Sequence, residues 1–179
     1  MTHIALLRAI NVAGNKMVAM SDLREFLTQL GFANAKSLLQ SGNLTFDAPR
    51  SAKNLEQLLE KESARRLGLE TVFFVRSPAE WDAIIEKNPF RKEAKDDPGR
   101  LVVLFLKDAR DGATLQKAIK GREVARGEGR QIYVYYPDGQ GRSKLTNALI
   151  EKTLATRATA RNWNTVLKLG RVDSVSGAP

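Results

Sequence analysis

The chain has 179 residues, of which 42% are apolar and 27% charged, so it is long enough for one sizeable globular domain or two small ones. It contains no cysteine, and His3 is its one histidine, which excludes disulfides and thiolate metal sites. A zinc or iron site would have to rest almost wholly on carboxylates. We therefore expect neither a metal nor another cofactor.

Hydropathy along the chain argues against a membrane protein. The start lacks a basic leader followed by an apolar run, and no later stretch approaches the roughly 18 consecutive apolar residues of a membrane span. We expect a cytoplasmic protein with no membrane partner.

Charge points to an anionic partner. The 29 Lys and Arg residues exceed the 20 Asp and Glu residues, for a net charge of +9. Residues 142–171 hold seven of these cations and a single acid, Glu151. Such a field attracts nucleic acid or an anionic metabolite. The alternative is a basic surface that only keeps the protein soluble.

The first 77 residues predict one alternating set of strands and helices. In chain order they read as a strand over 4–10, a helix from the N-cap Ser21 to the C-cap Gly31, strands over 35–40 and 44–47 around a turn at 41–43, a helix over 54–67 that ends at Gly68, and a strand over 71–76. This βαββαβ order predicts a ferredoxin-like half, in which both helices cover one face of an antiparallel sheet.

A connecting segment follows. Ser77 and Pro78 cap a helix that ends near Asn88, and residues 91–100 are rich in charge and contain Pro98 and Gly99, as linkers often do. We therefore divide the chain into a first half (1–77), a connecting helix and linker (78–100) and a second half (101–179).

The second half repeats the order of elements without a residue-by-residue repeat. It predicts a strand over 101–106, a helix over 111–120, strands over 123–126 and 131–136, a helix over 143–154, a strand near 157–161 and a closing helix from Asn162 to Gly170. Trp163, Thr165 and Leu167 alternate, so a closing strand is the alternative. The predicted fold class is α+β, with two tandem ferredoxin-like (βαββαβ) halves, antiparallel sheets, a connecting helix and a C-terminal helix.

Four stretches are unusually rich in amides, hydroxyls and cations: 8–16, 40–43, 139–144 and 159–168. We hypothesise that the fold brings some or all of them together around a ligand. The candidate ligand-binding residues are Arg8, Asn11, Lys16, Gln40, Ser41, Asn43, Arg142, Ser143, Lys144, Arg161 and Asn164.

The third stretch is a glycine-rich turn that leads into a predicted helix. Free NH groups at a helix start, with Arg142 and Lys144 beside them, would hold an anion. The order of residues is not that of a Walker A loop, so nucleotide hydrolysis is not supported. The structural alternative is that Ser143 only caps the helix.

The other stretches also have structural alternatives. Ser41 and Asn43 are common turn formers, whereas Gln40 could read a base edge or a carbonyl. Arg8 either pairs with a distant carboxylate, such as Glu25 or Glu151, or binds an anionic ligand together with Lys16.

No catalytic set stands out. The chain has no Ser/His/Asp or Cys/His combination, so a general acid or base would have to be a carboxylate or a lysine. Nothing in the sequence singles one out.

The polar stretches also carry a resemblance. Residues 6–14, 40–43, 142–145 and 159–166 resemble the signature stretches of the bacterial family called domain of unknown function 1697 (DUF1697), and the similarity runs over nearly the whole chain. The resemblance implies an α+β fold of two ferredoxin-like parts and no particular activity. One departure is Ala9, where the family more often has glycine.

Three hypotheses follow. The first is a protein that binds a phosphate-bearing ligand, nucleic acid or nucleotide, in a basic, amide-rich cleft. The second is an enzyme that acts on an anionic small molecule. The third is that the polar stretches are internal struts, which hold the fold through buried hydrogen bonds.

Overall fold

The chain folds into two compact units, residues 1–82 with 169–179 and residues 83–168. The computed structural model describes residues 1–8, 18–39, 42–49 and 51–175. The elements of the first unit are β1 (Thr2–Leu7), α1 (Met20–Gln29), β2 (Ala33–Leu38), β3 (Asn43–Asp47), α2 (Ala52–Leu67) and β4 (Phe73–Arg76). Two helices contribute to both units, α3 (Pro78–Glu86) and α7 (Trp163–Val175).

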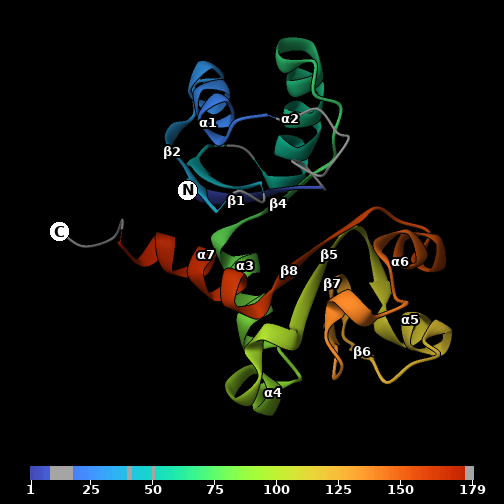
Figure 1. Cartoon of the computed structure of the whole chain (residues 1–179). Helices are drawn as coiled ribbons and strands as arrows, with labels where there is room; N and C mark the ends of the chain where they lie inside the picture. The colour runs from blue at the N-terminus through green and yellow to red at the C-terminus, as the bar shows by residue number, and fades with distance from the viewer. Residues whose placement is uncertain (9–17, 40–41, 50, 176–179) are drawn as a thin grey trace. The chain divides into compact units, whose positions relative to one another are not determined.

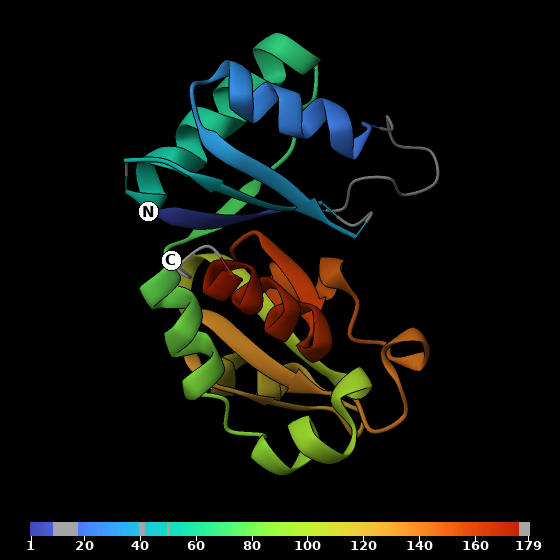
Figure 2. The ribbon, with the colours of Figure 1, turned by 90° about the vertical axis from the view of Figure 1, so that its left-hand side faces the viewer.

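The first unit contains a four-stranded antiparallel sheet in the order β2-β3-β1-β4. Register places Ala5 of β1 opposite Leu44 of β3 and Val75 of β4, so these three side chains share a face. They belong to a buried cluster that includes Leu23 of α1 and Leu59 of α2. Both views of the ribbon show α1 and α2 on the same side of this sheet (Figures 1 and 2).

The second unit contains α4 (Arg91–Asp96), a 3₁₀ turn η1 (Pro98–Arg100), β5 (Leu101–Asp111), α5 (Gly112–Ala118), β6 (Val124–Arg126), β7 (Glu128–Tyr135), a second 3₁₀ turn η2 (Gln140–Arg142), α6 (Asn147–Leu154) and β8 (Ala158–Asn162). Its four strands form an antiparallel sheet in the order β6-β7-β5-β8. The prediction of an α+β fold with antiparallel sheets is therefore confirmed.

The two faces of the second sheet have different partners. Leu104 and its cross-strand neighbour Ile132 pack in a cluster with Leu115 of α5 and Ile150 of α6. The next residue of β7, Tyr133, points to the opposite face, where its hydroxyl donates to the backbone oxygen of Ile84 at 2.5 Å. A residue's register on β5, β7 or β8 therefore decides on which face it lies.

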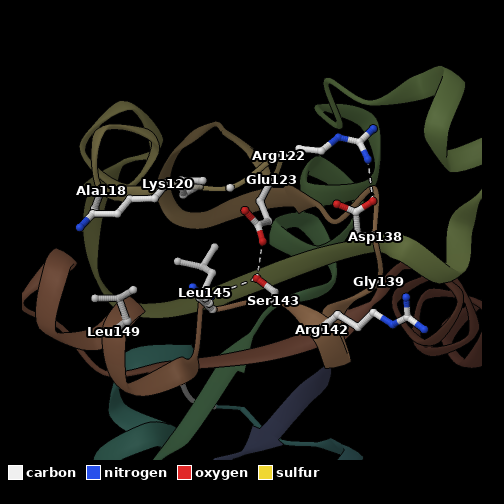
Figure 3. A pocket seen from close by; sticks show the side chains of 13 residues that line it. Ala118, Lys120, Arg122, Glu123, Asp138, Gly139, Arg142, Ser143, Leu145 and Leu149 are labelled. Atoms are coloured by element: carbon white, nitrogen blue, oxygen red, sulfur yellow. Dashed lines mark hydrogen bonds and ion pairs between the residues drawn. The ribbon is translucent and has the colours of Figure 1, made fainter.

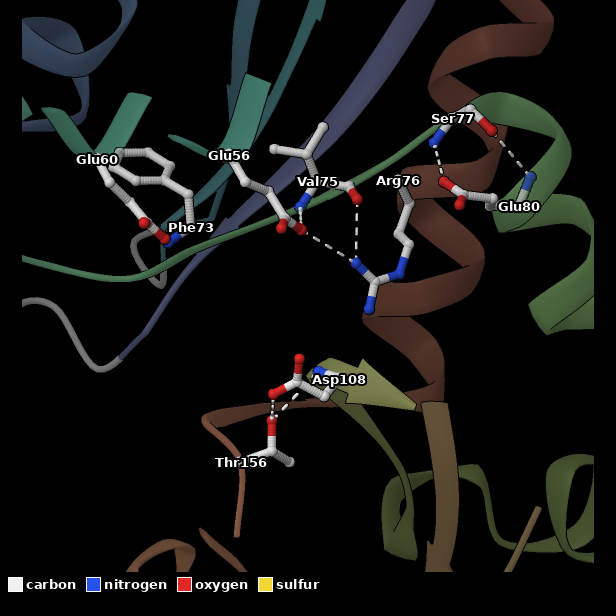
Figure 4. A network of polar contacts seen from close by, with 9 residues as sticks. All are labelled: Glu56, Glu60, Phe73, Val75, Arg76, Ser77, Glu80, Asp108 and Thr156. Atoms are coloured by element: carbon white, nitrogen blue, oxygen red, sulfur yellow. Dashed lines mark hydrogen bonds and ion pairs between the residues drawn. The ribbon is translucent and has the colours of Figure 1, made fainter. Parts of the chain in front are cut away.

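Two glutamates of α2 accept hydrogen bonds from backbone NH groups of the edge strand β4 (Figure 4). Glu56 accepts a hydrogen bond from the backbone NH of Val75 at 2.9 Å, and Glu60 accepts one from Phe73 at 3.0 Å. Glu56 also pairs with the buried Arg76 at 3.4 Å. Because β4 is an edge strand, these bonds occupy NH groups that could otherwise pair with another chain.

Several local predictions are confirmed. Gly68 follows α2 in the left-handed conformation, with φ of +61°. Ser77 and Glu80 form a capping box at the start of α3, in which each side chain accepts a hydrogen bond from the other residue's backbone NH. The side chain of Asn162 accepts a hydrogen bond from the Thr165 NH, so the closing segment is a helix.

Three predicted helix ends are wrong. Helix α1 begins at Met20, after Ala19 rather than after Ser21, and no side chain among the described residues caps it. The cap of α6 is Thr146, whose hydroxyl accepts from the Leu149 NH at 3.2 Å, so the helix begins after Ser143. Helix α7 continues past Gly170 to Val175, although glycine is a weak helix former.

The predicted linker, 91–100, contains the short helix α4 and the 3₁₀ turn η1. Contacts with β7 hold this segment in place. The Tyr135 hydroxyl donates a hydrogen bond to Asp97 at 3.0 Å, and the ring of Phe90, which precedes α4, lies against that of Tyr135.

Candidate functional site

The second unit contains a pocket of about 500 Å³ (Figure 3). The end of α5 and the segment after it form one wall, the segment between β7 and α6 forms another, and Leu149 of α6 completes it. We call it the Ser143 pocket. Its lining residues are Ala118, Ile119, Lys120, Gly121, Arg122, Glu123, Asp138, Gly139, Arg142, Ser143, Lys144, Leu145 and Leu149.

Apolar side chains line part of the pocket. Leu145 is buried, and Ile119 and Leu149 are half-buried beside it. All three belong to, or pack against, the core cluster between the sheet and its helices. This part of the pocket is therefore rigidly supported and can take the apolar face of a ligand.

A serine and a carboxylate meet inside the pocket. The Ser143 hydroxyl donates to Oε1 of Glu123 at 2.5 Å and accepts from the Leu145 backbone NH at 3.0 Å. Because the NH can only donate, it leaves the serine hydrogen for the carboxylate. Figure 3 shows the Glu123 carboxylate pointing toward Ser143 between the two walls.

Four cations surround this pair. Arg122 bonds Asp138 at 2.6 Å, but the two side chains are 72% and 56% exposed, so the ion pair contributes little stability. Lys120, Arg142 and Lys144 are also exposed, and none of them forms an ion pair with any residue that the structure describes. Figure 3 shows Lys120 and Arg142 reaching toward opposite sides of the pocket. The pocket thus has a cationic rim.

Tyr136 follows Tyr135, which pairs across the sheet with Val124, the chain neighbour of Glu123. Tyr136 is only 1% exposed, and its hydroxyl has no hydrogen-bond partner among the described residues. Burial, together with the nearby negative charge of Glu123, raises the pKa of Tyr136 to about 12. The phenol therefore stays protonated at neutral pH.

Glycines shape both walls. Gly139 has φ of +86°, a conformation that favours glycine, at the start of the turn that carries Arg142. A Cβ atom at Gly121 would lie 2.4 Å from Oε2 of Glu123, so any side chain at position 121 would displace the carboxylate.

Three predicted residues line the Ser143 pocket together: Arg142, Ser143 and Lys144. The predicted reason for their position is wrong, because α6 begins only at Asn147 and its free NH groups do not surround Ser143. They lie instead on the 3₁₀ turn η2 and the segment that follows it.

Arg161 and Asn164 do not line this pocket. Register pairs Arg161 with Val103, which in turn faces Tyr133, so Arg161 lies on the sheet face opposite α5 and α6. Arg161 is buried and donates to the Thr159 hydroxyl at 2.8 Å and to the Ala160 carbonyl at 2.9 Å. Burial lowers its pKa to about 10. Asn164 is exposed on the first turn of α7.

The candidates of the first unit form internal bonds where the structure describes them. The Arg8 NH donates to the Val72 oxygen at 3.1 Å, and the Asn43 amide donates to the Leu38 oxygen at 2.9 Å. Asn11, Lys16, Gln40 and Ser41 lie outside the described residues. That the four stretches share one ligand site stays a prediction.

Sequence reasoning missed the wall formed by residues 120–123. The signal was present as Lys120-Gly-Arg-Glu123, three charges around a glycine between a helix and a strand. Nothing local, however, indicated that this wall would face Ser143, because the two segments lie 20 residues apart and meet only through the fold.

The described part of the chain lacks two further features. It contains no group of three His, Asp or Glu side chains placed to hold a metal ion. None of its helices combines the length and apolar character needed to cross a membrane.

These features define a class: an α+β protein with two four-stranded antiparallel sheets and a cation-rimmed pocket in its second unit. The chain belongs to the DUF1697 family, described as a protein of unknown function, whose model matches residues 1–133. The solved structure of conserved bacterial protein SP0830 from Streptococcus pneumoniae is 25% identical, with a TM-score of 0.76 over 95% of this chain and 97% of that one. None of the curated proteins matches this chain.

Proposed function

We propose that this protein binds a phosphate-bearing ligand, a nucleotide or nucleic acid, in the Ser143 pocket. The observation that carries the proposal is the position of three exposed cations, Lys120, Arg142 and Lys144, at the rim of a pocket of ligand size. None of the three is paired with a described acid, so their charge is available to an anion.

Size and polarity support the same conclusion. A volume of about 500 Å³ falls within the range of small-molecule sites, which typically span about 300 to 1,000 Å³. Apolar side chains such as Leu145 can contact a base or sugar ring while the rim binds its phosphate. Exposed lysines and arginines alone would serve solubility equally well, so the hollow between them is what favours a ligand.

We also infer that each unit has the ferredoxin-like topology predicted from the sequence. The support is the order of elements, βαββαβ in both units, and a strand order in which the first strand of each unit lies between its third and fourth. In this arrangement the Ser143 pocket lies beside the two helices of the βαββαβ set in the second unit, α5 and α6.

An enzyme that acts on an anionic small molecule is the second candidate. The observation in its favour is the hydrogen bond between Ser143 and Glu123, since a carboxylate placed on a hydroxyl can take its proton. Incubation with a panel of phosphorylated metabolites, followed by mass spectrometry of the products, tests this candidate. Binding without any product supports the first candidate over the second.

The experiment for the binding proposal is titration calorimetry with nucleotides and with single-stranded RNA at two salt concentrations. The double variant Arg142→Ala/Lys144→Ala should weaken binding by about tenfold or more, because charged hydrogen bonds contribute about 1.5 to 3 kcal/mol each. Affinity of the wild-type protein should fall as salt rises.

The matched control is Lys92→Ala/Lys95→Ala, which removes two exposed cations from α4 of the same unit. Both double variants change the net charge equally, so a ligand held only by the overall field loses the same affinity in each. Equal losses, or no binding by the wild type, would refute the proposal.

A further inference from the structure

We propose that the ligand of the Ser143 pocket is a small phosphate ester that donates a hydrogen bond from a hydroxyl or amino group to Glu123, and not a nucleic-acid strand. This inference rests on the proposed function and adds the chemical class of the ligand.

The Glu123 carboxylate can accept more hydrogen bonds than it receives. Its Oε1 receives the Ser143 hydroxyl, while Oε2 receives no hydrogen bond from any residue that the structure describes. An ionised carboxylate only accepts hydrogen bonds and has about four lone-pair sites. Ser143 cannot rotate freely to supply more, since the Leu145 NH holds its oxygen. Glu123 is therefore ready to accept a hydrogen bond from a ligand.

Glycine at position 121 leaves space beside Oε2 of Glu123. Gly121 lies next to Oε2, and even a single methyl group there would come within 2.4 Å of it. Glycine at this position lets the carboxylate lie against the backbone of its own wall. Oε2 thus lies beside Gly121, a lining residue of the pocket, with no side chain between the two.

The negative charge of Glu123 and the positive charges of the rim favour different parts of a ligand. A carboxylate at the centre of a cationic rim repels a phosphate that comes close to it, while it favours a neutral donor group. A phosphate ester meets both demands, because its phosphate can bind at the rim and its hydroxyl or amino group can bind Glu123. A nucleic-acid strand would bring several phosphates past the same carboxylate.

The pocket also offers the ligand an apolar surface. The apolar side of the pocket, at Leu145 and Leu149, suits the non-polar face of a ring. Sugar phosphates and nucleoside monophosphates share the required chemistry, and they differ in how much of the apolar side they cover.

The test compares ligands and variants by titration calorimetry. The ligands are AMP, ribose 5-phosphate, inorganic phosphate and a short single-stranded RNA. We expect AMP or ribose 5-phosphate to bind more tightly than inorganic phosphate. Tighter binding of AMP than of ribose 5-phosphate would indicate that the apolar side holds a base.

The variant Glu123→Gln distinguishes a hydrogen-bond acceptor from a structural residue, because it should affect the two kinds of ligand differently. It should lower the affinity for the phosphate ester by about tenfold, since one charge-assisted hydrogen bond becomes a neutral one. The affinity for inorganic phosphate should stay unchanged or rise. A purely structural role of Glu123 would weaken both ligands. Gly121→Ala, which displaces the carboxylate without removing it, should weaken the phosphate ester alone and serves if Glu123→Gln does not fold.

The remaining outcomes separate this inference from the proposed function. In one outcome the ester loses its affinity for Arg142→Ala/Lys144→Ala and keeps it for both Glu123→Gln and Gly121→Ala. That result would refute the hydrogen bond to Glu123 and retain the phosphate site at the rim. RNA that binds more tightly than AMP, and tighter still to Glu123→Gln, overturns the inference in favour of a nucleic-acid strand. Failure of the wild-type protein to bind any of the four ligands overturns both.

Discussion

Replacement of Glu56 by alanine tests how much the buried ion pair contributes to the first unit. Glu56 and Arg76 are 5% and 1% exposed, and their nearest atoms lie 3.4 Å apart. Glu56 also accepts the Val75 NH at 2.9 Å. Loss of one partner from a buried pair costs about 3 to 5 kcal/mol, because the other charge stays out of water.

We therefore expect Glu56→Ala to lower the free energy of unfolding by about 3 to 5 kcal/mol. Glu56→Gln keeps an oxygen for the Val75 NH and loses only the charge, so its cost should be smaller. Glu60→Ala is the matched control on the same helix. Glu60 is half-buried and accepts the Phe73 NH at 3.0 Å, so its removal should cost about 1 kcal/mol.

The assay is urea unfolding followed by far-ultraviolet circular dichroism and tryptophan fluorescence, with the midpoints compared at constant m-value. Trp81, buried in the first unit, reports on the environment of this pair's unit. A cost for Glu56→Ala no larger than that for Glu60→Ala would refute the reasoning. It would mean that water or another group replaces Glu56 without a penalty.

Two further stability predictions concern His3 and Thr146. His3 is 1% exposed and stacks on Phe46; burial, aided by the positive chain terminus, holds the pKa of His3 below its ordinary value of 6.5. Below pH 6.5 the His3 imidazole therefore binds a proton more readily in the unfolded state than in the folded state. The free energy of unfolding should fall as the pH drops from 6.5 to the lowered pKa of the folded state. Thermal melts of wild type and His3→Asn across this range check it, and equal pH slopes would contradict it. Thr146→Ala removes the cap of α6 and should cost about 1 kcal/mol, whereas Ser21→Ala should cost almost nothing; urea unfolding of both variants is the measurement, and equal effects would contradict the assignment of the caps.

Local sequence signals predicted most elements because they depend on neighbouring residues alone. The apolar spacing over 54–67 defines a helix, and Gly68 ends it because glycine adopts the left-handed conformation at no steric cost. Ser77 and Pro78 similarly predict the start of α3, where the Ser77 side chain accepts a hydrogen bond from the Glu80 NH.

Local signals failed where a side chain had two alternative partners. Ser143 has the chemistry of a helix cap, but its hydroxyl bonds Glu123 and the Leu145 NH, and Thr146 caps α6 instead. Gly170 has the low helix propensity of a terminus, a cost of about 1 kcal/mol, yet α7 runs through it to Val175. Burial of Val166 and Leu169 stabilises the part of the helix that precedes Gly170.

The sequence by itself determined the class of the fold, the order of the strands and helices in each βαββαβ set, and the cationic character of the stretch that contains Arg142 and Lys144. Only the tertiary structure decided that residues 120–123 face Ser143 across a pocket, and that Arg161 lies on the other face of the same sheet. The physical reason is one of range. Strand and helix patterns arise within a few residues, whereas a pocket depends on which loops the sheet register brings together.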